Sequence, residues 1–134
     1  MENSFLFHVL MSGFVSGLII FQTALAAPIV FTYLKEDQSR IFIRKIFPRL
    51  FMILFIIGFI MLLSNLYFGI KSDFQYWVSI ISTIFPLICS LMVNTINRAT
   101  DSGNQKKFKV LHSISVSLIM IVLLTNLFWP FFIT

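Results

Sequence analysis

Four long apolar stretches, almost free of charged residues, constrain this chain more than any other feature of its sequence. A bilayer core about 30 Å thick is crossed by roughly 20 apolar residues in a helix. Only 11% of the residues are charged, against about 25% in an ordinary soluble domain. Runs of this length without alternation also argue against β-strands. We therefore predict an all-α integral membrane four-helix bundle, a single domain over residues 1–134 with spans at about 5–31, 47–68, 74–97 and 108–131.

The stretch QTALAAPIVF, residues 22–31, raises the question of a cleaved leader, because Ala24–Ala27 fits a small-residue cleavage pattern. A secretory leader needs a basic start and an apolar region of about 7–15 residues. Here residues 1–4 contain no Lys or Arg, and the apolar region from 5 to 27 is too long. We expect the pattern to mark the inner end of a first span that stays in the membrane.

The basic residues predict the orientation. All Lys and Arg residues except Lys71 lie in or at the ends of the first and third connections between spans. Basic connections stay on the cytoplasmic side, so we expect a multi-pass protein of the cell inner (cytoplasmic) membrane with its N-terminus and C-terminus both outside. The net charge of +5 follows from this rule, and no nucleic-acid partner is expected. The same connections are suited to anionic lipids at the cytoplasmic face.

Two local patterns predict how individual helices begin and pack. Residues 39–49 interleave basic and apolar side chains, which favours a segment along the inner headgroups before Pro48 opens the second span. Small residues at Gly13 and Gly17 let helix backbones approach closely in lipid. We expect this pair to mark packing inside the bundle.

Polar side chains within a span are costly and indicate either packing contacts or a functional site. Asn94, Asn97 and Arg98 share one helical stripe, and His112 enters the last span at a similar depth. Asp101 is the expected partner of Arg98 or His112. These residues predict an inner polar cluster closed by Gln22 or Arg49, with the candidates Gln22, Arg49, Asn94, Asn97, Arg98, Asp101 and His112. Two interpretations stay open: a network that holds helices together, or a binding or proton-relay site around His112.

The residue types present do not indicate catalysis. His8 and His112 should lie on the order of 20 Å apart along the bundle, which is too far for both to ligate one haem iron. No pattern of metal-ligating residues is evident, and no Ser-His-Asp set or carboxylate pair can be assembled. The single cysteine, Cys89, cannot form a disulfide within the chain. We expect no catalytic, metal or cofactor-binding residues and no cofactor.

Three short motifs carry a family resemblance: Ala-Pro-x-x-Phe at residues 27–31, Phe-Pro-Arg at residues 47–49, and Phe108, Leu111 and His112 at the start of the last span. In these motifs the chain resembles the transmembrane protein 205-like family, whose bacterial members are grouped as domain of unknown function 4149. The resemblance implies a small integral membrane protein with four spans. It implies no established catalytic activity.

The expected function is that of a non-enzymatic membrane protein, either a scaffold or a component that binds a partner or lipid. Two alternatives remain: a small transporter or efflux component acting as an oligomer, and a haem- or metal-binding redox membrane protein. The expected partners are the lipid bilayer, including its anionic lipids, and either a second copy of the chain or another membrane protein.

The predicted orientation can be tested with reporter fusions. Alkaline phosphatase depends on the oxidising compartment outside the cytoplasm, so a fusion after Thr134 is expected to be active in cells. A fusion within residues 100–104 is expected to be inactive, because those residues belong to a basic cytoplasmic connection. The reverse pattern of activities would show that both termini face the cytoplasm.

Overall fold

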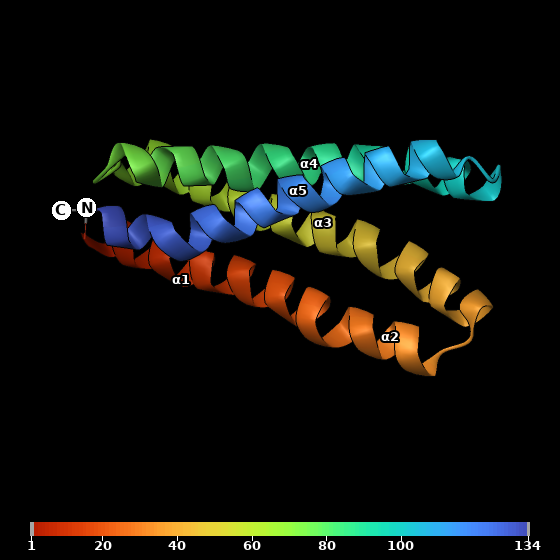
Figure 1. Ribbon diagram of the computed structural model, residues 1–134. Coiled ribbons are helices and arrows are strands. Elements are labelled where there is room, and N and C mark those ends of the chain that lie inside the picture. The colour runs from red at the N-terminus through yellow and green to blue at the C-terminus, as the bar shows by residue number, and fades with distance from the viewer. Residues whose placement is uncertain (1, 134) are drawn as a thin grey trace.

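Four helical rods make up the described part of the chain, residues 2–133 of a computed structural model (Figure 1). Each rod is long and apolar enough to cross a membrane. The prediction of an all-α four-helix membrane bundle is therefore confirmed. The rods span Glu2–Tyr33, Glu36–Phe68, Asp73–Asp101 and Gln105–Phe132.

Two of the rods contain a change of helix type. The first rod is α-helical, then passes through one π-helical segment, and then returns to α-helix. The last rod finishes in a short 3-10 helix. The elements in chain order are α1 (Glu2–Ile20), η1 (Phe21–Ala26), α2 (Ala27–Tyr33), α3 (Glu36–Phe68), α4 (Asp73–Asp101), α5 (Gln105–Phe128) and η2 (Trp129–Phe132).

The helices begin at residues that satisfy free backbone N–H groups. At the start of α4, Ser72 Oγ accepts a hydrogen bond from the N–H of Phe74 at 3.2 Å. At the start of α5, Asn104 Oδ1 accepts from the N–H of Lys107 at 3.2 Å. Such caps stabilise a helix start by about 1 kcal/mol. The two caps, Ser72 and Asn104, mark where the third and fourth spanning helices begin.

Pro48 does not begin the second spanning helix. The expectation that this helix starts at Pro48, after a segment lying along the headgroups, was wrong. Glu36–Phe68 is one continuous helix with Pro48 in its interior. The helix starts earlier because the Lys35 N–H donates to the side chain of Gln38 at 3.2 Å and acidic residues fill the first turn. Proline removes one backbone hydrogen bond, and the capped start and the long helix on either side outweigh that loss. The basic stretch 39–49 is therefore the first part of the spanning helix.

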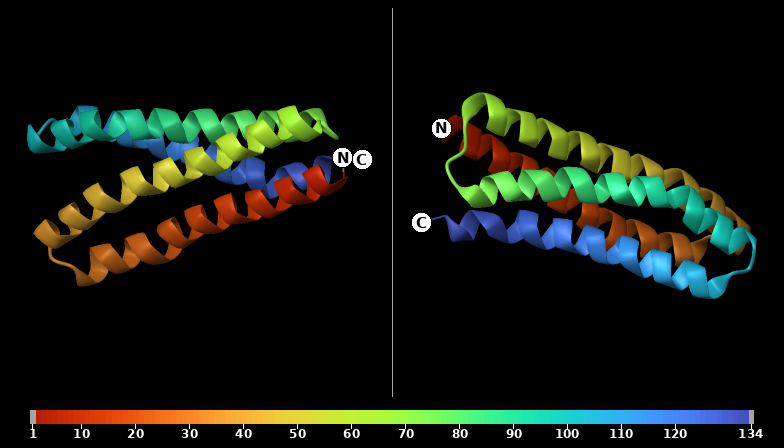
Figure 2. Two further views of the ribbon diagram at one scale, coloured as in Figure 1. Left: turned by 180° about the vertical axis from the view of Figure 1, so that it is seen from behind. Right: turned by 90° about the horizontal axis from the view of Figure 1, so that it is seen from above.

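The two ends of the bundle differ in how the rods pair (Figures 1 and 2). The termini end holds the start of α1, the turn at residues 69–72 and the end of the last rod. The loop end holds the connections at residues 34–35 and 102–104. At the loop end α2 and α3 form one pair while α4 and α5 form another, and the two pairs diverge. At the termini end α3 has crossed to lie along α4, and α5 has crossed to lie along α1.

The backbones of α3 and α4 approach each other closely at Gly58. A Cβ atom added at Gly58 would overlap the backbone carbonyl of Ser82. Next to this contact lies the central apolar core, in which Val15, Leu54 and Val122 are completely buried. In lipid no hydrophobic force drives helices together, so close backbone packing of this kind contributes much of the association energy.

Gly13 and Gly17 of α1 do not pack against another helix of the bundle. A Cβ atom at Gly13 or Gly17 would meet nothing within 4 Å, and both residues are exposed. The neighbouring serines, Ser12 and Ser16, are the residues that face the interior. The expectation that Gly13 and Gly17 mark packing inside the bundle was wrong, because the helix is rotated to bury the serine stripe.

Replacement of Gly58 by Ala is expected to destabilise the protein by about 1–3 kcal/mol, because the new methyl group forces α3 and α4 apart. The measurement is thermal unfolding of the purified protein in detergent. Gly13→Ala is the matched control, since the added methyl group meets no neighbour and alanine favours helix. Equal melting temperatures for the two variants would contradict the close α3–α4 contact.

Candidate functional site

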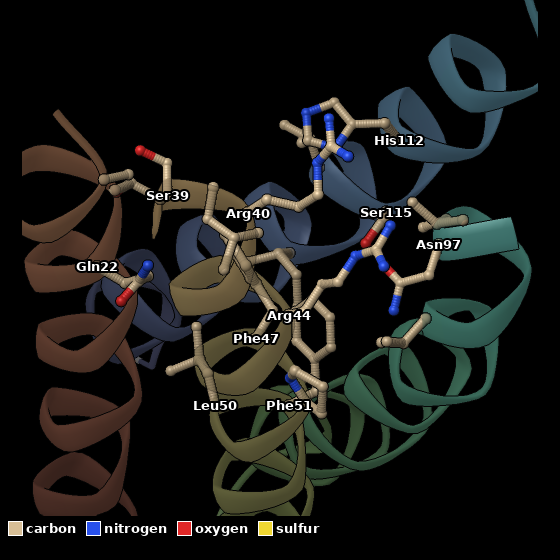
Figure 3. Close-up of a pocket in the computed structure, with 18 of the residues that line it drawn as sticks. Gln22, Ser39, Arg40, Arg44, Phe47, Leu50, Phe51, Asn97, His112 and Ser115 are labelled. Atoms are coloured by element: carbon tan, nitrogen blue, oxygen red, sulfur yellow. The ribbon is translucent and has the colours of Figure 1, made fainter. Parts of the chain in front are cut away.

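A cleft of about 830 Å³ lies at the loop end, where the two helix pairs diverge (Figure 3). Its walls come from the first rod and from α3, α4 and α5. Ligand pockets in proteins have volumes of roughly 300–1,000 Å³, so the cleft is large enough for a small amphiphilic molecule.

The floor of the cleft is apolar. Ile19, Leu50, Phe51 and Ile119 line it, and the same four residues belong to the buried core of the bundle. The floor is therefore backed by packed side chains, and it presents a hydrocarbon surface to whatever enters.

The rim of the cleft is polar and basic. Arg40 and Arg44 reach it from α3, Asn97 from α4 and His112 from α5 (Figure 3). Arg40 forms an exposed ion pair with Glu36 at 3.4 Å. The ring of His112 stacks on that of Phe108, with their centroids 5.4 Å apart. The cleft thus combines an apolar interior with a mouth rich in hydrogen-bond donors.

One ion pair crosses between helices at this end. Arg44 of α3 contacts the carboxylate of Asp101, the last residue of α4. The expected partners of Asp101 were Arg98 and His112, and this expectation was wrong. Arg44 lies one helical turn after Arg40 on the face of α3 that points into the cleft, which places its guanidinium beside the end of α4.

Gln22 contributes a polar group deep in the cleft wall. It is the only buried residue of the π-helical segment, with 5% of its surface exposed. Within residues 2–133 its side-chain amide has no hydrogen-bond partner. The Ala27 N–H donates to the Gln22 carbonyl, a spacing of five residues that marks the π-register. Single π-turns inside α-helices occur frequently at functional sites, and this one holds an unpartnered amide against the cleft.

The structure brings together some of the residues predicted for the inner polar cluster. Gln22, Asn97 and His112 line the cleft, while Asn94, Arg98 and Arg49 are exposed and lie outside its lining. Sequence reasoning missed Arg40 and Arg44. Their i, i+4 spacing within residues 39–49 was the available signal, and it was obscured by the expectation that this segment lies along the headgroups.

A second polar group lies at the termini end, and sequence reasoning did not assemble it. The amide nitrogen of Gln75 lies 2.8 Å from Asn65 Oδ1, 3.2 Å from Ser4 Oγ and 3.2 Å from His8 Nδ1. Asn65 Nδ2 donates to Ser79 Oγ at 2.8 Å. We call Ser4, His8, Asn65, Gln75 and Ser79 the termini-end network, and each of them is less than 5% exposed.

The two histidines belong to opposite ends of the bundle. His8 lies in the termini-end network, whereas His112 lines the cleft. The i, i+4 pairs Ser4–His8 and Gln75–Ser79 were visible in the sequence as signals for the network. Among residues 2–133, no group of three or more His, Cys, Asp or Glu side chains is placed to hold a metal ion.

The two buried glutamines should respond differently to replacement. Gln75→Leu is expected to lower stability by about 1–3 kcal/mol, because it leaves buried partners without their hydrogen bonds. Gln22→Leu is expected to leave stability unchanged or raise it, because the side-chain amide of Gln22 makes no hydrogen bond with the described residues, 2–133. Thermal unfolding in detergent measures both, and an equal loss in the two variants would contradict the assignment of Gln22 to the cleft.

Comparison with known proteins places the chain in a family. No curated protein and no solved structure matches it. Residues 10–101, more than half of the chain, match the family described as a domain of unknown function (DUF4149). That range includes the motifs at residues 27–31 and 47–49 but ends before His112. The resemblance noted from the sequence is confirmed, and this four-helix membrane protein belongs to the DUF4149 family.

Proposed function

We propose that this protein is a non-catalytic membrane component that binds an anionic phospholipid in the loop-end cleft, on the cytoplasmic side of the inner membrane. The observation that carries the proposal is the division of one cleft into an apolar floor and a basic rim. A molecule that fills both parts must be amphiphilic, with a hydrocarbon portion and a negatively charged head.

The apolar part of the cleft favours an acyl chain. Ile19, Leu50 and Ile119 are between 0% and 9% exposed around the floor. Burial of hydrocarbon contributes about 0.8 kcal/mol per methylene group when the alternative is water. For a lipid that is already in the bilayer, this gain in free energy is small. The acyl chain therefore contributes shape complementarity to the cleft, and the headgroup contributes most of the selectivity.

The rim favours a phosphate head. Arg40 and Arg44 supply guanidinium groups, each of which already contacts one carboxylate, Glu36 or Asp101. A guanidinium has five N–H donors, so each arginine keeps further donors for phosphate oxygens. Asn97 and His112 add further hydrogen-bonding groups at the same mouth. All Lys and Arg residues of the chain except Lys71 lie at this end, so the local field also favours an anion over a zwitterion.

The position of the cleft supports a ligand that arrives through the membrane. Its lining includes Phe31 of α2 and Val116 of α5, which are 67% and 44% exposed on the diverging helices of the loop end. Side chains this apolar on the outside of a spanning helix face lipid. A lipid can therefore enter sideways, without leaving the bilayer.

The surroundings of His112 do not favour a catalytic role. Within residues 2–133 the ring of His112 makes no hydrogen bond to a serine or a carboxylate, and it stacks on Phe108 instead. Catalytic histidines are commonly oriented by such a partner. The arrangement of the rim therefore favours binding over catalysis.

The proposal can be tested by lipid retention in native mass spectrometry. The protein in neutral detergent is incubated with phosphatidylglycerol, with phosphatidylcholine and, separately, with inorganic phosphate. We expect retention of phosphatidylglycerol, and a roughly tenfold lower bound fraction in the Arg40→Gln/Arg44→Gln double variant, because charge-assisted bonds to the head are lost. Arg49→Gln is the matched control, an exposed arginine of the same helix outside the cleft.

A second pair of variants tests whether an acyl chain occupies the apolar part of the cleft. Val116→Trp fills the cleft from α5, and Ile114→Trp is its control, because both residues are 44% exposed but only Val116 lines the cleft. Loss of bound lipid in Val116→Trp alone supports the site. Equal retention of both lipids, or equal loss in a variant and its control, would show that lipid binds only as a general annulus.

A further inference from the structure

Two buried polar side chains line the cleft without a strong hydrogen-bond partner from the protein. They are Gln22 of η1 and Ser115 of α5, which are 5% and 6% exposed. Within residues 2–133 the Gln22 amide makes no hydrogen bond, and the Ser115 hydroxyl makes none to an oxygen or a nitrogen. Most buried polar groups in proteins are paired, so these two side chains are suited to partner atoms that come from a ligand.

The hydroxyl of Ser115 differs from that of Thr23, which lines the same cleft. Thr23 donates to the carbonyl of Ile19 on its own helix at 2.8 Å. Among residues 2–133 the Ser115 hydroxyl makes no such bond. The thiol of Cys89 is beside it, with Sγ 3.6 Å from the Ser115 carbonyl oxygen, but sulfur is a weak acceptor. The hydroxyl can therefore donate to a stronger acceptor in the cleft.

Gln22 and Ser115 lie at a similar depth, below the basic rim. Gln22 precedes the connection at residues 34–35 by twelve residues, and Ser115 follows Asn104 by eleven. At about 1.5 Å per residue, both lie roughly 17 Å from the loop end. Arg40 follows the same connection by only five residues, and Figure 3 shows Gln22 lower on the cleft wall than Arg40. The two polar side chains are therefore placed to contact a part of the ligand that lies beneath its headgroup.

A phospholipid bound by the rim brings acceptors to this depth. Arg44 contacts Asp101, the last residue of α4, so its guanidinium and that of Arg40 hold a phosphate near the loop end. In a diacyl phospholipid, glycerol links this phosphate to two ester carbonyls that lie deeper in the membrane. Ester carbonyls accept hydrogen bonds and donate none, whereas Gln22 and Ser115 each carry a donor. A ligand with only hydrocarbon at this depth would cover both donors without pairing them, which weakens its binding.

We propose that Gln22 and Ser115 bind the two ester carbonyls of a diacyl phospholipid and make the cleft selective for ester-linked glycerolipids. This selectivity rests on the lipid site proposed above and adds a second point of recognition to it. The arginines of the rim select for the negative charge of the headgroup, whereas Gln22 and Ser115 select for the linkage between glycerol and the acyl chains. Their low exposure strengthens these hydrogen bonds, because little water reaches the side chains to compete.

Native mass spectrometry with two matched lipids tests the ester contacts. The protein in neutral detergent is incubated with equal amounts of dipalmitoyl phosphatidylglycerol and its dihexadecyl ether analogue, which has the same headgroup and chain length but no ester carbonyls. We expect the wild-type protein to retain the diester about fivefold more than the diether, because the diether cannot accept the two hydrogen bonds. Gln22→Leu and Ser115→Ala are each expected to lower this ratio to about twofold.

Thr23→Val is the matched control. Thr23 lines the cleft, but its hydroxyl already bonds to its own helix, so the preference for the diester should stay at about fivefold. If Gln22→Leu does not fold, Gln22→Met takes its place, because methionine keeps the length of the side chain and lacks the amide.

The outcomes distinguish this selectivity from the lipid site itself. Equal retention of the two lipids by the wild-type protein, with both lowered in the Arg40→Gln/Arg44→Gln variant, would overturn the ester contacts and leave the lipid site in place. A preference for the diester that persists in the Gln22→Leu/Ser115→Ala double variant would also overturn the ester contacts. Retention of neither lipid by the wild-type protein would overturn both proposals.

Discussion

The hydrogen bonds of Gln75 hold the termini end of this bundle together, and the arrangement of the rods depends on them. Its amide contacts side chains of α1 and α3 from a position on α4. Because lipid supplies no hydrophobic force between helices, rods associate where polar groups find partners or where backbones meet closely. The close backbone contact of Gly58 with Ser82 also holds α3 and α4 together.

Among residues 2–133 the loop end has no comparable hydrogen-bond network. There the rods carry nearly all of the basic residues, and the ion pair between Arg44 and Asp101 joins α3 to α4. The helix pairs diverge and leave a cleft whose floor is continuous with the core. The bundle is thus held by a hydrogen-bond network at the termini end and opens into a cleft at the loop end. The proposed lipid site lies in the cleft at the open end.

The first rod runs from the termini-end network to the cleft. His8 lies near its start, Ser12 and Ser16 face the core, and Gln22 follows Ile19 by three residues on the same buried face. The rod therefore carries one polar side chain into the network and another into the cleft wall.

Much of the fold could be predicted because span length and hydropathy act locally. The four rods, the gathering of basic residues toward one end, and the placement of His8 and His112 at opposite ends all follow from the order of residues along helices of known rise. The sequence also identified Gln22, Asn97 and His112 as members of one end. Only the tertiary structure decided which polar groups meet. Helix rotation buried Ser12 in place of Gly13, a continuous helix through Pro48 brought Arg44 to Asp101, and packing of three rods enclosed His8. These contacts join residues far apart in the chain, and their partners are chosen by the rotation and crossing of whole helices, which no local pattern encodes.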